Sequence, residues 1–487
     1  MNPITRHPVR SIAILLAAIC VGLILLAIVA TLFWPTGDLR ERLTTLASEQ
    51  LDMPVHVDGD VSLRFWPSPI IRATEVRVGP APESGDDPVG ELDSISLSMR
   101  WWPLLGGDVQ PKTLRFEAPV VRLTPGTLEA LASRDPPDDT GRDAPFEPLD
   151  LRIRDGEIHW RAAESDRELS IDGLDLSLDD LQWEPPSDDG HPLSRLSLTL
   201  TASAETVRLN ALRLTDITLS GSGKEGRFAT DDWQMTFIDS RGSGSARLDV
   251  RDSPANAMLD IAFDDMELAK LPEQWVPPGS IAGAADLTAS LASEGPPDKW
   301  LRHLSGEIRI SGRDLRLRGV DLDEELASYR RTQRFSLVDA GAVVFLGPAW
   351  LLASKGSDFA RLLDESKGKE TPIVHLVSDW KLDEGTAQSR DVALSTRRNR
   401  IAAQASLDMP SQRINRATVA VLDRKGCPVV TQEVHGRFDA PQIEEPNLME
   451  ELLGAPLGLL QRGMDAISRE DESCEVFYSG SVAAPSE

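Results

Sequence analysis

The chain has 487 residues, of which 41% are hydrophobic, and its formal net charge is -27. This length allows several domains or one elongated domain with a sizeable core or groove. The acidic balance argues against a nucleic-acid partner, because binding to phosphate requires clustered Lys and Arg, and it fits a surface outside the cytoplasm.

A long apolar segment follows a short tail that contains Arg6 and Arg10. Residues 11–34 contain no charged side chain. They are long enough to cross a hydrocarbon core of about 30 Å, and the preceding arginines favour a cytoplasmic N-terminus. A cleaved signal peptide is the competing interpretation, but its apolar region would be unusually long and Ile28 is a poor residue for its cleavage site. We therefore expect an uncleaved anchor, with Trp34 at the membrane interface.

A change of period follows the anchor. Asp38 and Glu41 form the start of a short amphipathic helix that should end before Pro54. From Val55 to Leu317, apolar and polar residues then alternate in many short runs, which segments rich in Pro, Gly and Asp separate. Such alternation is typical of half-buried antiparallel strands, so the sequence predicts a mainly β protein with some α structure.

The predicted strands share one apolar face, and few helices are expected to cover it. A sandwich or a closed barrel would bury this face against itself, whereas an open sheet would leave an apolar groove, and the alternation does not separate these options. The pattern becomes mixed later in the chain. We expect helices within residues 321–337, 357–366 and 447–467, and a buried or interfacial apolar segment at 340–354 that is too short to span a membrane.

The search for catalytic and metal-binding motifs is almost empty. The sequence contains no His-Glu-x-x-His, no Cys-x-x-Cys and no Gly-x-Ser-x-Gly. Gly221–Gly226 matches Gly-x-Gly-x-x-Gly, but a strand pattern follows it, so a hairpin turn is favoured over a phosphate site. Asp175, Asp179 and Asp180 lack the spacing of a calcium-binding loop. We expect no enzymatic activity, no cofactor and no metal.

Three cysteines and several tryptophans remain. Cys20 lies in the predicted anchor as a small apolar residue, while Cys427 and Cys474 form a pair for which a disulfide is favoured over two free thiols. Besides Trp34, the tryptophans near the first strands are candidates for the membrane interface, although packing in a core is equally compatible. These candidates are Trp66, Trp101 and Trp102.

Several stretches of the chain together resemble one protein family. They are "LRERLTTLASEQLDMPVHVDGDVSLRFWPSPIIRATEVRVG", "MRWWPLLGGDVQPKTLRFEAPVVRL" and, later, "GEIRISGRDLRLRGVDLDEEL", "DVALSTRRNRIAAQASLDM" and "GCPVVTQEVHGRF". With the anchor, they resemble the AsmA family of inner-membrane-anchored periplasmic proteins of Gram-negative bacteria. The resemblance covers roughly residues 11–123 and 306–480, and the middle is similar only in its strand rhythm.

The resemblance implies an elongated, curved antiparallel β-sheet with an apolar groove, like that of bridge-type lipid transfer proteins, and a mixed α/β C-terminal region. It also implies a role in outer-membrane biogenesis, either in moving phospholipid or in the assembly of outer-membrane proteins. The family has no catalytic motif to carry over. The implied location is the bacterial inner membrane, with a single pass and with most of the chain in the periplasm.

These inferences define expected segments and a candidate site. The segments are a cytoplasmic tail (1–10), a transmembrane helix (11–34), an AsmA-like helix and strands (35–125), a β-rich middle region (126–305) and an AsmA-like C-terminal region (306–487). The candidate groove residues are Leu63, Phe65, Ile95, Leu97, Leu114 and Phe116. Membrane phospholipid and the inner membrane are the expected partners. The alternative is a scaffold without lipid that binds envelope proteins and assists the assembly or targeting of outer-membrane proteins.

Overall fold

The computed structural model shows a mainly β protein that divides into two compact units. Unit 1 consists of Met1–Phe237, Ser243–Ala257 and Gly295–Asp298, and unit 2 of Ile238–Gly242, Met258–Glu294 and Lys299–Glu487. The structure describes residues 40, 44–45, 47–48, 53–64, 68–79, 88–105, 110–124, 149–161, 168–183, 191, 193–210, 212–251, 253–272, 280–319, 321–324, 326, 369–438, 440–444, 447–448 and 474–486.

Within these residues, no helix has the length and apolar character needed to cross a bilayer. The predicted anchor, residues 11–34, lies outside them, as does the apolar segment 340–354. Arg40, Thr44–Thr45 and Ala47–Ser48 are helical, in agreement with the short helix expected after the anchor.

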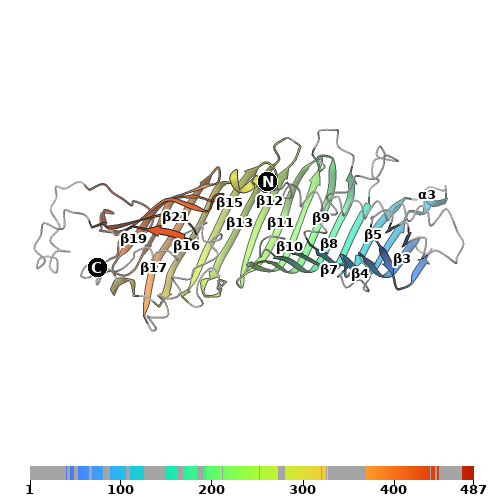
Figure 1. Ribbon diagram of the computed structural model, residues 1–487, viewed down its shortest axis with the longest axis horizontal. Helices are drawn as coiled ribbons and strands as arrows, with labels where there is room; N and C mark the ends of the chain where they lie inside the picture. The colour runs from blue at the N-terminus through green and yellow to red at the C-terminus, as the bar shows by residue number, and fades with distance from the viewer. Residues whose placement is uncertain are drawn as a thin grey trace, which may run out of the picture. The chain divides into compact units, whose positions relative to one another are not determined.

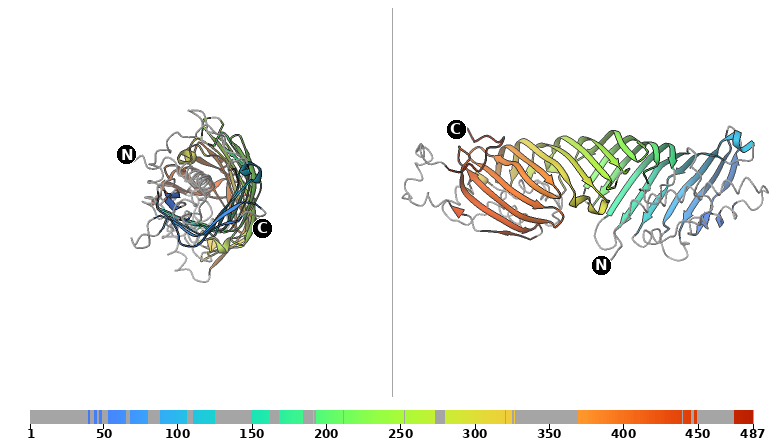
Figure 2. Two further views of the ribbon diagram at one scale, coloured as in Figure 1. Left: turned by 90° about the vertical axis from the view of Figure 1, so that its right-hand side faces the viewer. Right: turned by 90° about the horizontal axis from the view of Figure 1, so that it is seen from above.

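Unit 1 is built on a sheet of long strands (Figure 1). The strands are β1 (Val55–Val57), β2 (Val61–Arg64), β3 (Ile70–Val78), β4 (Gly90–Met99), β5 (Pro111–Glu117), β6 (Val120–Leu123), β7 (Leu149–Arg161), β8 (Glu168–Trp183), β9 (Leu196–Leu209), β10 (Leu212–Lys224) and β11 (Arg227–Phe237). A short helix, α3 (Trp101–Leu105), follows β4. Seen from its blue end, this sheet is curved (Figure 2).

One pairing in unit 1 departs from the predicted antiparallel sheet. Strand β7 runs parallel to β5 and β6, whereas the other pairs, such as β3 with β4 and β8 with β9, are antiparallel. A parallel pair requires a long crossover connection, and the chain has residues 124–148 between β6 and β7 for this purpose.

The register of unit 1 separates an apolar face from a polar face. Residues that pair directly on neighbouring strands project from the same face of a sheet. One such row is aliphatic: Leu63, Ile71, Leu97, Leu114, Leu151, Leu178 and Leu200. The row beside it is polar and lies on the opposite face: Ser62, Arg72, Ser96, Arg115, Arg152, Ser177 and Thr201.

The alternation shifts by one residue at positions with a left-handed backbone. Asp155, Asp180 and Asp216 have φ values of 51°, 51° and 50°, and the pairing register is irregular around each of them. Such a bulge inserts one extra residue into a strand. The Asp155 amide donates a hydrogen bond to Asp175 Oδ1 at 3.0 Å, so the neighbouring strand satisfies the displaced backbone group. The apolar face therefore continues past the bulges.

Unit 2 carries the later strands and two short 3-10 helices. They are β13 (Asn256–Glu267), β14 (Ile281–Ala282), β15 (Ala284–Glu294), β16 (Ser305–Arg318), β17 (Glu370–Asp383), β18 (Thr386–Ser395), β19 (Arg400–Asp408), β20 (Arg413–Leu422), β21 (Pro428–Arg437), β22 (Ala440–Ile443) and β23 (Asn447–Leu448), with η2 (Leu268–Lys270) and η3 (Pro297–Arg302). The unit boundary crosses η3, β13 and β12 (Ser240–Asp249). Figure 2 shows the strands of residues 370–420 side by side in orange.

Strands β17 to β20 of unit 2 are buried on both faces. One face contributes Leu394, Ile401 and Val421 to a large apolar cluster. The opposite face contributes Ala393 and Ala402 to a second cluster, together with Tyr478 and Val482 from the end of the described chain. Unit 2 thus differs from unit 1, whose outer row is polar.

The structure also tests two helices predicted from the sequence. Leu322–Glu324 and Leu326 are helical, and the remainder of the segment up to residue 337 lies outside the described residues. Within the segment expected to contain the last helix, Asn447 and Leu448 pair with Thr431 and Val430 of β21, and residues 449–467 lie outside the described residues. The long-range pairing overrides the local helical pattern there.

Leu114 provides a test of the core of unit 1. It is 0% exposed, so Leu114→Ala should lower the free energy of unfolding of unit 1 by about 2–5 kcal/mol through lost burial and the cavity left behind. Urea denaturation followed by circular dichroism measures this change. Lys112→Ala is the matched control on the same strand, because Lys112 is exposed and its truncation should change stability by no more than about 0.5 kcal/mol. Equal stability of the two variants would contradict the assignment of Leu114 to the core.

Candidate functional site

The predicted groove residues lie on the apolar face of unit 1, at its N-terminal end. Leu97, Leu114 and Phe116 are 6%, 0% and 8% exposed and belong to one buried cluster. Leu63 and Ile95 are half-buried and pack against it. The structure therefore brings these five residues together as a packed core rather than as an exposed lining. Phe65 lies outside the described residues.

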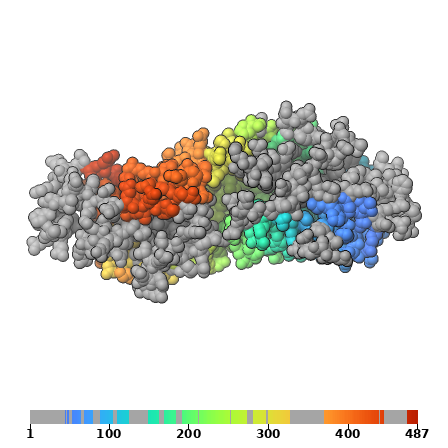
Figure 3. Space-filling model, viewed as in Figure 1, coloured from blue at the N-terminus to red at the C-terminus, as the bar shows by residue number. Residues whose placement is uncertain are grey.

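The same face is partly exposed farther along the sheet, on strands β8 to β11. Leu176 and Leu178 of β8 still pack against the buried cluster. Beyond them, several aliphatic and aromatic side chains are half-buried, whereas Met235 and Phe237 of β11 are buried. We call the following half-buried set the open apolar surface: Leu198, Leu200, Ile217, Leu219 and Trp233. Figure 3 shows, in green, part of the surface that these strands present to solvent.

The register explains why these side chains form one continuous surface. Leu200 pairs with Leu178, and Leu219 pairs with both Ala202 and Trp233. Strands lie about 4.8 Å apart, so the surface extends over roughly 10 Å from β9 to β11. Small residues such as Ala202 separate the larger side chains and keep the surface shallow.

Gly221 and Gly223 lie beside this surface, and their glycine-rich motif is a hairpin as predicted. Lys224 pairs with Arg227, and Glu225 and Gly226 between them have positive φ values of 47° and 81°. Two consecutive left-handed residues form a tight turn of the type that joins antiparallel strands. The motif therefore connects β10 to β11.

The opposite face of unit 1 is held by ion pairs and hydrogen bonds. Arg152 forms an ion pair with Asp179, and Arg208 forms one with Asp172 at 2.6 Å. Within the part of the chain that the structure describes, no group of His, Cys, Asp or Glu is arranged to hold a metal ion. The acidic residues near Asp175 are thus occupied by local contacts on a hydrated face.

The predicted interface tryptophans differ in exposure. Trp102 on α3 is 85% exposed, the largest value among the exposed large hydrophobic residues of the described chain, whereas Trp101 beside it is half-buried. Trp34 and Trp66 lie outside the described residues. Trp102 is therefore open to contact from outside the chain, and its place at a membrane interface stays a prediction.

The favoured cysteine pair is joined in the structure. A disulfide links Cys427 and Cys474, with their Cα atoms 6.1 Å apart, which lies within the normal range for such bonds. It ties the turn before β21 to residues 474–486.

The fold and the open apolar surface together define a class of protein. It is a mainly β protein whose sheet in unit 1 has one polar face and one apolar face, part of which is uncovered. Residues 10–133 match the model of the AsmA family, which supports the resemblance to that family seen in the sequence. The family is generally associated with the cell envelope. A comparison with curated proteins gave no match.

The groove residues predicted from the sequence are buried or half-buried in one cluster, whereas the open apolar surface lies farther along the same face, on β9 to β11. The open apolar surface carries the same alternating signal as residues 63–116, so alternation alone did not distinguish the two. The feature that separates them is burial, which depends on what packs against each part of the face.

A pair of matched substitutions distinguishes core from surface. Leu97→Asp should lower the free energy of unfolding by more than about 3 kcal/mol, because it places an unpaired carboxylate in a buried cluster. Leu200→Asp should cost about 1 kcal/mol or less, because water reaches position 200. Thermal denaturation of both variants measures the difference. Unfolding of the Leu200 variant would show that this part of the face is core.

Proposed function

We propose that this AsmA-like protein is anchored in the inner membrane, extends into the periplasm and binds phospholipid acyl chains on the open apolar surface as part of outer-membrane biogenesis. The observation that carries the proposal is the change in exposure along one row. Leu114 is fully buried, whereas Leu200 in the same row is partly exposed. A partly exposed row of leucines is a surface on which a hydrocarbon chain replaces water.

The free energy of removing hydrocarbon from water favours the binding of an acyl chain on this surface. Each methylene removed from water contributes about 0.8 kcal/mol, so a chain that buries about ten methylenes gains about 8 kcal/mol before the entropic cost of ordering it. The opposite face carries a polar row that includes Arg152, whose charge is paired with Asp179. A charged headgroup would remain in water at the margin of the sheet.

The other elements of the chain support a role in binding rather than in chemistry. Residues 11–34 supply the anchor, and the acidic composition suits a periplasmic surface. Trp102 would lie at the headgroup level of the membrane. The proposal requires no catalytic residue, cofactor or metal.

A scaffold without lipid is the second candidate, and the buried cluster around Leu97 and Leu114 favours it. A face that is closed along its full length would serve as a core, and the protein would then assist the assembly or targeting of outer-membrane proteins through its surface. The partly exposed leucines of β9 and β10 argue for lipid binding instead.

Photocrosslinking tests the lipid proposal at residue level. A photoreactive amino acid at Leu200 or Leu219 should capture phospholipid in cell membranes, because both side chains belong to the open apolar surface. Thr201 and Ser220 are matched controls, since they pair with each other on the opposite face. We expect at least about tenfold more lipid adduct at the two leucine positions, measured by mass spectrometry. Equal capture on both faces, or none at either leucine, would favour the scaffold.

Trp102 provides a separate test of membrane contact. Trp102→Cys, labelled with a fluorophore in the full chain reconstituted in nanodiscs, should be quenched by phospholipids brominated along their acyl chains. A label at Ser96 of β4, on the polar face, is the control and should not be quenched. Equal quenching at the two positions, or none at position 102, would contradict an interfacial role for Trp102.

A further inference from the structure

Residues 474–486, which we call the strap, cover part of the outer face of unit 2, on strands β17 to β20. Beneath them lies a row of small apolar residues, one on each of four neighbouring strands: Val377, Ala393, Ala402 and Ala420. Tyr478 and Val482 of the strap pack on this row, at 8% and 0% exposure. The short alanine side chains leave room for the tyrosine ring to lie close to the sheet.

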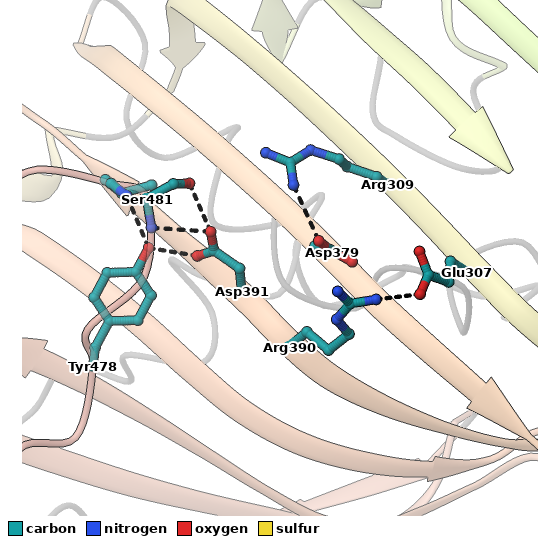
Figure 4. Close-up of polar contacts among 8 residues, drawn as sticks. Glu307, Arg309, Asp379, Arg390, Asp391, Tyr478 and Ser481 are labelled. Carbon is teal, nitrogen blue, oxygen red and sulfur yellow. Dashed lines mark hydrogen bonds and ion pairs between the residues drawn. The ribbon is translucent and has the colours of Figure 1, made fainter.

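Asp391 of β18 is the polar centre of the strap contact (Figure 4). Its carboxylate accepts hydrogen bonds from Tyr478 Oη at 2.5 Å, from the Ser481 amide at 3.0 Å and from Ser481 Oγ at 2.6 Å. Burial raises the pKa of Asp391, but the hydrogen bonds from Ser481 and Tyr478 outweigh this effect and hold the pKa below its ordinary value. The carboxylate is therefore charged when the strap is in place.

A buried arginine holds the strap from the other side. Arg400 is 7% exposed, and its guanidinium donates hydrogen bonds to the carbonyl oxygens of Val482 at 3.2 Å and Asp423 at 3.0 Å. Its charge also lies 5.6 Å from the centre of the Tyr478 ring. The strap thus supplies the Arg400 guanidinium with a hydrogen-bond acceptor, the Val482 carbonyl oxygen, which is lost when the strap leaves.

The disulfide fixes the first residues of the strap to the turn before β21. Cys427 is 9% exposed, whereas Cys474 is exposed to solvent. Next to the bond, the amides of Phe477 and Tyr478 donate to the Gly426 carbonyl oxygen at 3.0 and 3.2 Å. Cys474 is therefore the more exposed of the two disulfide-bonded residues.

We propose that the strap is a redox-controlled cover, closed over this part of the outer face of unit 2 when Cys427 and Cys474 are joined and released when a dithiol reductant separates them. A thiolate of the reductant attacks Cys474 Sγ, and Cys427 leaves as a thiolate that takes up a proton. The second thiol of the reductant then displaces Cys474 from the mixed disulfide. The protein gains two electrons and two protons, and the reductant becomes a disulfide.

The balance of interactions explains why the covalent bond controls the strap. Only Tyr478 and Val482 are buried among residues 474–486. Two buried side chains and a few hydrogen bonds must offset the conformational entropy of ordering the whole segment. The disulfide holds the strap at a high effective concentration beside its site, and its loss removes this advantage. Release exposes the row of small apolar residues.

Hydrogen exchange of the full chain tests the proposal. The strap amides at 477, 478, 481 and 482 should exchange at least about tenfold faster after reduction with dithiothreitol than in the oxidised protein. Cys474→Ser should exchange at the fast rate without reductant. Amides of β9 and β10 in unit 1 are the internal control and should keep their rates, so the outcome does not depend on lipid binding.

Asp391→Asn separates the contribution of the polar centre from that of the disulfide. In the oxidised state this variant should keep most of the strap protection, since the covalent bond remains. After reduction its strap should exchange faster than that of the reduced wild type, because the charge-assisted hydrogen bonds are lost as well. Strap protection that does not change when the wild type is reduced would overturn the proposal. So would strap protection in unreduced Cys474→Ser that equals that of the oxidised wild type.

Discussion

The structure depends on one constraint: directly paired residues of neighbouring strands project from the same face of a sheet. In unit 1 this constraint aligns Leu97, Leu114 and Leu151 in one row, while the polar residues between them form a separate row on the opposite face. Backbone hydrogen bonds are satisfied within the sheet itself. Each face is therefore free to serve a different purpose, and the material that covers it determines whether it is a core or a binding surface.

Two leucines of the same row illustrate this dependence on cover. Leu114 is fully buried, and Leu200, to which it is linked through Leu151 and Leu178, is partly exposed. Nothing in the residue type differs between them. Exposure along the face therefore depends on tertiary packing. The proposed binding of an apolar guest requires the part of the face that is not already packed as a core.

The alternating pattern predicted the strands, the apolar face and the hairpin at Gly221–Gly226, because these features depend on local periodicity and turn chemistry. The bulge at Asp216 has a local signal in the sequence, because two polar residues, Thr215 and Asp216, interrupt the alternation there. Asp also tolerates the left-handed backbone of the bulge. The parallel pairing of β7 and the strand at Asn447 were not predictable, because both depend on residues distant in the sequence. The exposure of Leu200 was not predictable either, because it depends on which distant residues pack against that part of the face.

The alternating pattern is lost in some strands of unit 2, and burial of both faces of those strands explains the loss. In β18 and β19, Val392–Leu394 and Ile401–Ala403 are runs of consecutive buried apolar residues. Such runs indicate a strand that is buried on both faces. Unit 1 keeps a polar outer row, with Arg152 among its members, and this row is stable in water without a cover. Unit 2 has alanines in the corresponding outer row, so its sheet needs a second layer, and a short segment fastened by a disulfide supplies that layer with few residues.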